Sequence, residues 1–290
     1  MAGLLRSVPP SAFRLPSPPG GKSIRRRTGV SAEIRETVEI EGERSPSPKI
    51  SPPPGFKPPE PKRFSVRPDK FLDILGASLA LPFRLGTGVF VLGYSVSLVS
   101  EDKIPPGEYA LKIAGLTFKE TSNLGAQARP EKPIEIYEFE GCPFCRKVDP
   151  NTGVAMYESD DIIKYLVQKY GDGTTPLMLS LGLLTTLTEG FAMIGRMGKG
   201  SSYSPSKTPP MPLEIWAYEG SPFCKIVREV LVELELPHIF RSTARGSPKR
   251  QELYKRVGRF QVPYLEDPNT GVKMFESAEI IDYLRTTYAL

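Results

Sequence analysis

The sequence predicts an α/β domain in the last 80 or so positions of the 290-residue chain, and three observations support this fold class. First, LEIWAY at 213–218 has the two-residue period of a β-strand. Second, Pro222 follows where the first residue of a helix belongs, since its missing N–H costs nothing there. Third, apolar residues recur after it at helical spacing, at Phe223, Ile226, Val227, Val230, Leu231 and Leu234.

The segments that follow alternate between strand and helix patterns. We expect a strand in PHIFRST, a helix in PKRQELYKRVG and a third strand in QVPYLE. The turn DPNTG then leads into VKMFE, and SAEIIDYLRTTY forms a third helix. The expected order within 213–290 is strand, helix, strand, helix, strand, strand, helix, with Trp216 in the core and His238 in a structural role.

Part of this pattern occurs twice. Residues 134–147 match 213–226 at 7 of 14 positions, and residues 148–166 match 266–284 at 13 of 19. Agreement of this kind, in the same order, identifies an internal repeat. The two matching blocks are separated by 39 more residues in the second copy than in the first, so the first copy, 131–176, lacks its middle.

The complete copy resembles the thioredoxin fold and, more narrowly, the N-terminal domain of glutathione transferases and the glutaredoxins. The residues that carry the resemblance are Ser221-Pro222-Phe223-Cys224 after the first strand, Val262-Pro263 before the third, and Glu276-Ser277 at the start of the last helix. The expected fold is therefore a thioredoxin-like C-terminal domain of glutathione transferase type, preceded by a truncated copy and a disordered N-terminal region.

The resemblance implies glutathione as ligand or co-substrate, with a role for each motif. Ser221 would stabilise the glutathione thiolate, because a hydrogen bond to the charged form lowers its pKa. Val262, before a cis Pro263, would pair its backbone with the cysteinyl part. Ser277 and the helix N–H groups would receive the γ-glutamyl carboxylate, and Glu276 the ammonium. Alternatively, Ser277 is only a helix cap and Glu276 a solvated charge.

The three cysteines are candidate catalytic thiols, but each has a competing interpretation. A glutaredoxin attacks with the first cysteine of its motif, where this copy has Ser221; Cys224 matches the second cysteine and fits a small buried residue better than a reactive thiol. Cys142 and Cys145 form a CPFC pair, with Cys142 as the attacking thiol. Asp149-Pro150 limits the helix after them to about one turn, so we expect ordinary, slow thiols. Three cysteines do not supply the four ligands of a structural zinc, and no metal is expected.

The truncated copy also lacks the strand that would join its surviving strands, so an independent fold is not expected for 131–176. The pattern suggests a variant of a longer tandem protein whose first copy was whole. We expect a helix over 177–197 and a flexible linker over 198–212.

The composition of the N-terminal third indicates a targeting segment and a disordered segment. Residues 1–32 hold six basic residues and no acidic one, like a chloroplast transit peptide; a basic disordered tail is the alternative. Without this segment the net charge is about −1, so no nucleic-acid partner is expected. Residues 33–70 predict a disordered proline-rich linker. Residues 71–130 predict an apolar helical region, in which 85–100 is a buried helix or hairpin in preference to a membrane contact.

Two function classes follow. The leading one is glutathione-linked thiol chemistry, either thiol–disulfide exchange or a transferase-like activity. The alternative is a non-catalytic binding or scaffold module associated with plastid membranes through 71–100 and 176–195. Ordinary conjugation is not expected, because the sequence reaches Leu290 directly after the third helix, whereas such transferases add a helical domain that forms the electrophile pocket.

Overall fold

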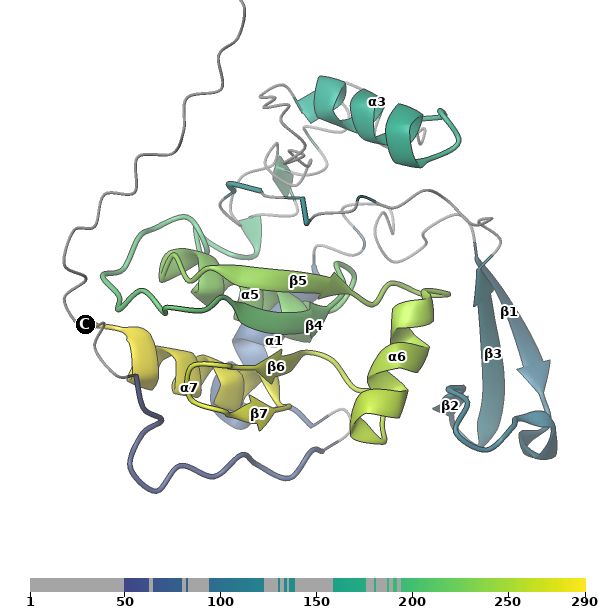
Figure 1. Cartoon of the computed structure of the whole chain (residues 1–290), viewed down its shortest axis with the longest axis horizontal. Helices are drawn as coiled ribbons and strands as arrows, with labels where there is room; N and C mark the ends of the chain where they lie inside the picture. Colours follow the sequence, from purple (N-terminus) through teal and green to yellow (C-terminus); the bar gives the residue numbers. More distant parts are fainter. Residues whose placement is uncertain are drawn as a thin grey trace, which may run out of the picture. The chain divides into compact units, whose positions relative to one another are not determined.

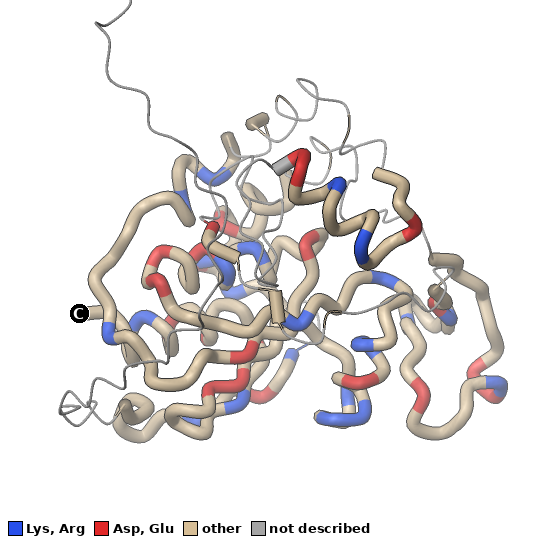
Figure 2. The backbone as a smooth tube through the Cα atoms, turned by 45° about the horizontal axis from the view of Figure 1, so that its top comes forward, with Lys and Arg blue, Asp and Glu red and all other residues tan. Residues whose placement is uncertain are grey.

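The computed structural model describes most of the chain from Ile50 onward, and all described residues belong to one compact unit, 47–290. The described ranges are 50–62, 65–79, 94–122, 133–134, 136–138, 159–175 and 194–290, with the single positions 82, 130, 180, 187, 190 and 191. The predicted transit peptide, residues 1–32, and the CPFC motif lie outside them. Acidic and basic positions are mixed along the described chain (Figure 2).

The C-terminal domain has the predicted order of elements around a four-stranded sheet (Figure 1). Its strands are β4 (Leu213–Ala217), β5 (His238–Ser242), β6 (Tyr264–Glu266) and β7 (Lys273–Met274), arranged β5-β4-β6-β7. Strand β4 runs parallel to β5 and antiparallel to β6, and β6 is antiparallel to β7. This is the mixed sheet of a thioredoxin-like domain, so the predicted fold class is confirmed for this region.

Three helices cover the sheet: α5 (Pro222–Glu233), α6 (Pro248–Val257) and α7 (Ser277–Tyr288). The two-residue period of β4 explains how they divide between its faces. Ile215 lies in one core cluster with residues of α5 and α7, whereas its neighbour Trp216 lies in a second cluster with Leu253 of α6. Both side chains are fully buried, so the sheet is packed on both faces.

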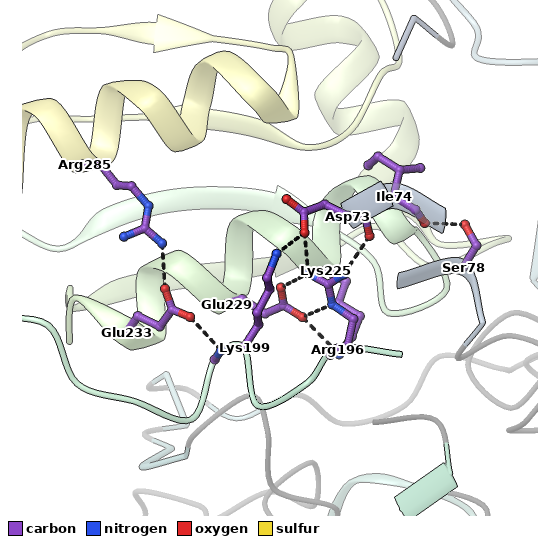
Figure 3. Close-up of polar contacts among 10 residues, drawn as sticks. Asp73, Ile74, Ser78, Arg196, Lys199, Lys225, Glu229, Glu233 and Arg285 are labelled. Atoms are coloured by element: carbon purple, nitrogen blue, oxygen red, sulfur yellow. Dashed lines mark hydrogen bonds and ion pairs between the residues drawn. The ribbon is translucent and has the colours of Figure 1, made fainter. Parts of the chain in front are cut away.

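An N-terminal helix, α1 (Phe71–Ser78), adds to the α5 and α7 side of this domain, after the short 3-10 helix η1 (Pro68–Lys70). Ile74 and Ala77 belong to the same core cluster as α5 and α7. Close packing depends on two glycines, because a Cβ on Gly76 would lie 2.4 Å from the carbonyl oxygen of Gly195. A buried ion pair joins Arg196, next to that contact, to Glu229 of α5 (Figure 3).

The helical prediction for 71–130 is wrong at 94–122. A three-stranded antiparallel sheet forms instead, with β1 (Tyr94–Val99), β2 (Leu111–Ile113) and β3 (Leu116–Ser122) in the order β1-β3-β2, and with the 3-10 helix η2 (Glu101–Lys103). Alternation in YSVSLV fits a strand better than a helix. Ala114 and Gly115 both have positive φ, at 49° and 79°, which is the geometry of a two-residue hairpin turn.

The truncated repeat is described only in part. Its predicted last helix is present as α3 (Ser159–Tyr170). Of the strand expected at 134–139, the described positions 134 and 136–138 are not in a strand. Within the helix expected at 177–197, the described positions 187, 190, 191 and 194 are helical, whereas 180 lies in a bend and 195–197 lie in a turn. None of the helices within the described ranges has the length and apolar character needed to span a membrane.

The segment predicted as a flexible linker, 198–212, follows the C-terminal domain closely. The backbone N–H of Ser204 donates to the carbonyl of Glu233, and that of Lys207 to the carbonyl of Tyr288. Ser206 forms a β-bridge with Ala289. These contacts tie the segment to the ends of α5 and α7, so it differs from the mobile connection expected from its glycine, serine and proline content.

Candidate functional site

The sheet register brings two of the three predicted motifs to one edge of the sheet. Trp216, near the end of β4, lies opposite Tyr264, the first residue of β6. The chain leaving β4 toward Ser221 and the chain entering β6 through Val262-Pro263 therefore meet at the same end of these strands.

The third motif reaches the same edge through β7. Leu265 of β6 lies opposite Met274, the last residue of β7. Next in the chain, Phe275 packs its ring against that of Tyr264, with 4.6 Å between the ring centroids. Glu276 and Ser277 follow directly. We call the residues 218–221, 262–263 and 276–277 the loop edge; it contains Ser221, Val262, Pro263, Glu276 and Ser277 of the predicted site.

Ser221 is the N-cap of α5. Its Oγ accepts a hydrogen bond from the backbone N–H of Cys224 at 3.3 Å, and Pro222 occupies the first helical position. The cap uses the hydroxyl as an acceptor, so its proton can be donated to a nearby sulfur, including that of Cys224. Ser221 therefore combines a helix-capping role with a hydroxyl placed at the positive end of the α5 dipole, where a thiolate would be stabilised.

Cys224 lies one turn inside α5 and is only 1% exposed. Burial raises the pKa of its thiol to about 11, although hydrogen bonding to Ser221 and proximity to Arg228 act in the opposite direction. Because the thiolate is the reactive form, a thiol that is both inaccessible and neutral at physiological pH reacts slowly. The arrangement argues against Cys224 as a catalytic group and favours its interpretation as a small core residue.

The Val262–Pro263 peptide bond is cis. Val262 is partly buried and packs against both core clusters, the one on the α5 and α7 face and the one around Trp216. Its backbone is thereby held between the two helical layers, immediately before β6. The residue before it, Gln261, was not predicted, yet its side-chain Nε2 donates to Oε1 of Glu276 at 2.7 Å.

Glu276 has an unusual backbone conformation for a residue with a side chain, with φ 71° and ψ 106°. Such a conformation costs about 1–3 kcal/mol and is most frequent at functional sites. It turns the chain between Phe275 and Ser277, which are both buried. The Glu276 side chain makes no hydrogen bond to α7, so its carboxylate is directed to other donors and the helix N-terminus lacks a side-chain cap.

A buried aspartate at the opposite end of the β6–β7 hairpin fixes α7 in place. Asp267 accepts hydrogen bonds from the hydroxyl of Tyr283 at 2.5 Å and from that of Tyr288 at 2.6 Å. Burial, together with these bonds to Asp267, raises the pKa of both tyrosines. The DPNTG turn thus holds α7 along its length, and the position of Ser277 depends on it. From the sequence, this turn was expected only to connect two strands.

A cavity formed by other described residues lies away from the loop edge. It has a volume of about 410 Å³ and is lined by 106–109, Glu120 and residues of the 246–255 segment, none of them a predicted site residue. Arg250 lies in its wall and bonds to both Glu120 and Tyr109. These bonds join the β1–β3 sheet to α6. Cys142 and Cys145, the remaining predicted site residues, lie outside the described part of the chain.

Comparison with known families agrees with this geometry. The model of the family described as Glutathione S-transferase, N-terminal domain, matches residues 216–290. Searches of curated proteins and of solved structures gave no significant match. The matched residues contain all three parts of the loop edge. Residues 216–290 are therefore a thioredoxin-like module of the glutathione S-transferase N-terminal type.

Proposed function

We propose that the C-terminal domain binds glutathione at the loop edge. The observation that carries the proposal is the meeting, at one end of the sheet, of the α5 N-terminus, the Val262 backbone and the Glu276-Ser277 pair, in which Glu276 has a positive φ. Each supplies a type of group that a different part of the tripeptide needs. The family match over 216–290 supports the same ligand class.

In this proposal each residue acts on a defined part of glutathione. The Ser221 hydroxyl and the dipole of α5 stabilise the thiolate. The Val262 backbone aligns the cysteinyl part. The Ser277 hydroxyl and the first N–H groups of α7 receive the γ-glutamyl carboxylate, and the Glu276 carboxylate receives its ammonium.

The proposed chemistry uses the sulfur of the ligand in place of a cysteine of this domain. Cys224 is buried and has a raised pKa, so it does not serve as nucleophile. Thiol–disulfide exchange or a transferase-like reaction would then begin from the bound glutathione thiolate. Cys142 stays a candidate for a second, attacking thiol, with Cys145 as its partner.

Calorimetric titration of the full chain with reduced glutathione tests the proposal. Ser277→Ala removes one hydroxyl at the proposed carboxylate site, and we expect at least about tenfold weaker binding, the effect of one hydrogen bond to a charged group. Ser247→Ala is the matched control, because Ser247 also lies at a helix N-terminus, as the N-cap of α6. Equal affinities for the two variants would contradict the proposed role of Ser277.

A scaffold function is the second candidate, and exposed apolar side chains on α1 favour it. Leu72 is 76% exposed and Leu75 is 50% exposed, one helical turn apart, and Ile194 beyond the Gly76–Gly195 contact is 68% exposed. Such side chains suit contact with a partner or a membrane surface better than water. If the folded chain does not bind glutathione in the titration, the scaffold function becomes the favoured one.

Plastid targeting is a further part of the proposal. The acid-free, basic composition of residues 1–32 supports cleavage of this segment on import. Import of the full chain into isolated chloroplasts, followed by sequencing of the mature N-terminus, tests it. Recovery of the uncleaved chain outside the organelle would contradict it.

A further inference from the structure

A proline-rich segment, residues 50–62, lies along α7 and reaches the loop edge (Figure 1). We call it the strap. The sequence predicted disorder here, yet the strap makes specific contacts. The backbone N–H of Lys62 donates to Oε1 of Glu276 at 2.5 Å, and the Lys62 carbonyl accepts from Nε2 of Gln261 at 3.4 Å. The carbonyl of Pro61 accepts from Arg259, also at 3.4 Å.

The contact with Glu276 uses the carboxylate that the proposed site offers to a ligand. Oε1 of Glu276 already accepts from Gln261, and the Lys62 N–H is its second donor. The γ-glutamyl ammonium of glutathione is also an N–H donor and would need this carboxylate. Each carboxylate oxygen has two lone-pair sites, and Gln261 and Lys62 already occupy both on Oε1, so a ligand N–H can bond to this oxygen only in place of one of them.

The strap is held on both sides of this contact. Upstream, the Phe56 ring packs against that of Tyr283 on α7, with centroids 5.0 Å apart, and Ile50 and Phe56 pack on the core cluster. Downstream, Arg67 bonds to Asp282 of α7 at 2.6 Å. Phe56 is positioned by a turn in which its N–H donates to the carbonyl of Pro53 and Gly55 has a φ of 72°.

The composition of the strap lowers the cost of this arrangement. Six of its thirteen residues are proline, at 52, 53, 54, 58, 59 and 61. Proline restricts the unbound chain to extended conformations, so less entropy is lost when the strap is fixed against α7. A segment tethered to the domain also competes at a high effective concentration.

From these contacts we propose that the strap is an intrachain competitor of glutathione, in which the Lys62 N–H occupies the ammonium-binding position at Glu276. The inference rests on the proposed function, because it concerns regulation of the same site. Glutathione binds fully only when the strap has left Glu276, so its apparent affinity is reduced by the fraction of molecules in which the strap is docked. Any event that lifts the strap raises the affinity.

One pair of variants isolates the competing N–H. Lys62→Pro removes the N–H together with the side chain, whereas Lys62→Ala removes the side chain and keeps the N–H. Lys62 is exposed, so neither change disturbs the core. In full-chain protein titrated with reduced glutathione, we expect Lys62→Pro to bind roughly two- to tenfold more tightly than Lys62→Ala, the range of a single hydrogen bond. Equal affinities would overturn the inference.

A second measurement follows the strap itself. Hydrogen exchange of the Lys62 amide is expected to be slow in unliganded wild type and faster when glutathione is added. Phe56→Ala, which removes the upstream anchor, is expected to speed this exchange and to tighten binding, whereas Lys57→Ala, an exposed neighbour, does neither.

The outcomes separate the two proposals. If wild type binds glutathione and hydrogen exchange of the Lys62 amide does not change, the strap inference is overturned and the proposed function stands. Binding seen only in Lys62→Pro and Phe56→Ala supports both. If no variant binds glutathione while circular dichroism shows all to be folded, the proposed function fails, and the strap inference fails with it.

Discussion

Arg196 and Glu229 form a bidentate ion pair inside the protein, with Nε to Oε1 at 2.7 Å and Nη2 to Oε2 at 2.5 Å (Figure 3). Their side chains are only 4% and 3% exposed. Arg196 also donates to the carbonyl of Asp73 on α1 at 2.8 Å. One guanidinium group therefore links α1, α5 and the turn after Gly195.

Removing one member of this pair should be strongly destabilising. Arg196→Ala leaves the Glu229 carboxylate buried with only Lys225 nearby, at 3.7 Å, and we expect a loss of about 3–5 kcal/mol in the free energy of unfolding. Urea denaturation measures it. Lys199→Ala, which breaks the more exposed pair with Asp73, is the control and should cost below about 1 kcal/mol. Similar losses in both variants would contradict the buried role of Arg196.

The contact between α1 and the Gly195 turn leaves no room for a methyl group. Gly76→Ala places a Cβ 2.4 Å from the Gly195 carbonyl, so we expect α1 to shift and stability to fall by about 1–3 kcal/mol. Gly190→Ala is the control, since a Cβ there meets nothing within 4 Å and alanine favours a helix. In thermal denaturation, we expect a lower Tm than that of wild type only for Gly76→Ala. A neutral result for Gly76→Ala would refute the packing of α1 described above.

Burial of Cys224 predicts a loss of stability in alkali. Its pKa is raised from 9.0 to about 11, so the folded state favours the neutral thiol. The resulting stabilisation is complete below the unfolded pKa near 9.0 and disappears as pH rises through about 11; two pKa units correspond to roughly 3 kcal/mol. In a Cys142→Ser, Cys145→Ser background, the loss of stability in alkali should be larger with Cys224 than with Cys224→Ala, in which buried tyrosines of raised pKa such as Tyr283 and Tyr288 still contribute. Identical pH profiles would show that the thiol is not protected.

The backbone at Glu276 predicts a trade between stability and binding. Glu276→Gly relieves the positive φ, and we expect a net gain of about 1 kcal/mol in unfolding free energy after its two hydrogen bonds, one exposed and one partly buried, are lost. The same variant should bind glutathione more weakly, because the ammonium loses its acceptor. Glu276→Gln keeps the strain and should not gain stability. Chemical denaturation and calorimetry on the same preparations test both parts.

Local patterns were sufficient to predict the C-terminal domain. Pro222 and the apolar stripe after it define α5, and the alternation in β4 separates Ile215 from Trp216 on opposite faces. The convergence of Ser221, Val262 and Glu276 followed from element order, because strand pairing in this fold determines which loops share an edge.

Features that depend on contacts between distant segments were not predictable in this way. A proline-rich sequence forms no ladder and has no periodicity, so nothing in residues 50–62 indicated the contact with Glu276, 214 positions away. The apolar run before β1 has neither a clear helical nor a clear strand period. Gln261 is a polar residue in a loop, and its role becomes visible only when Glu276 lies beside it.

The glutathione site at the loop edge is the central claim, and amide chemical shifts of the isotope-labelled full chain test it most directly. On addition of reduced glutathione, the account predicts saturable shifts at Ser221, Val262, Glu276 and Ser277, together with release of Lys62. Unchanged amides at these positions throughout the titration would contradict it.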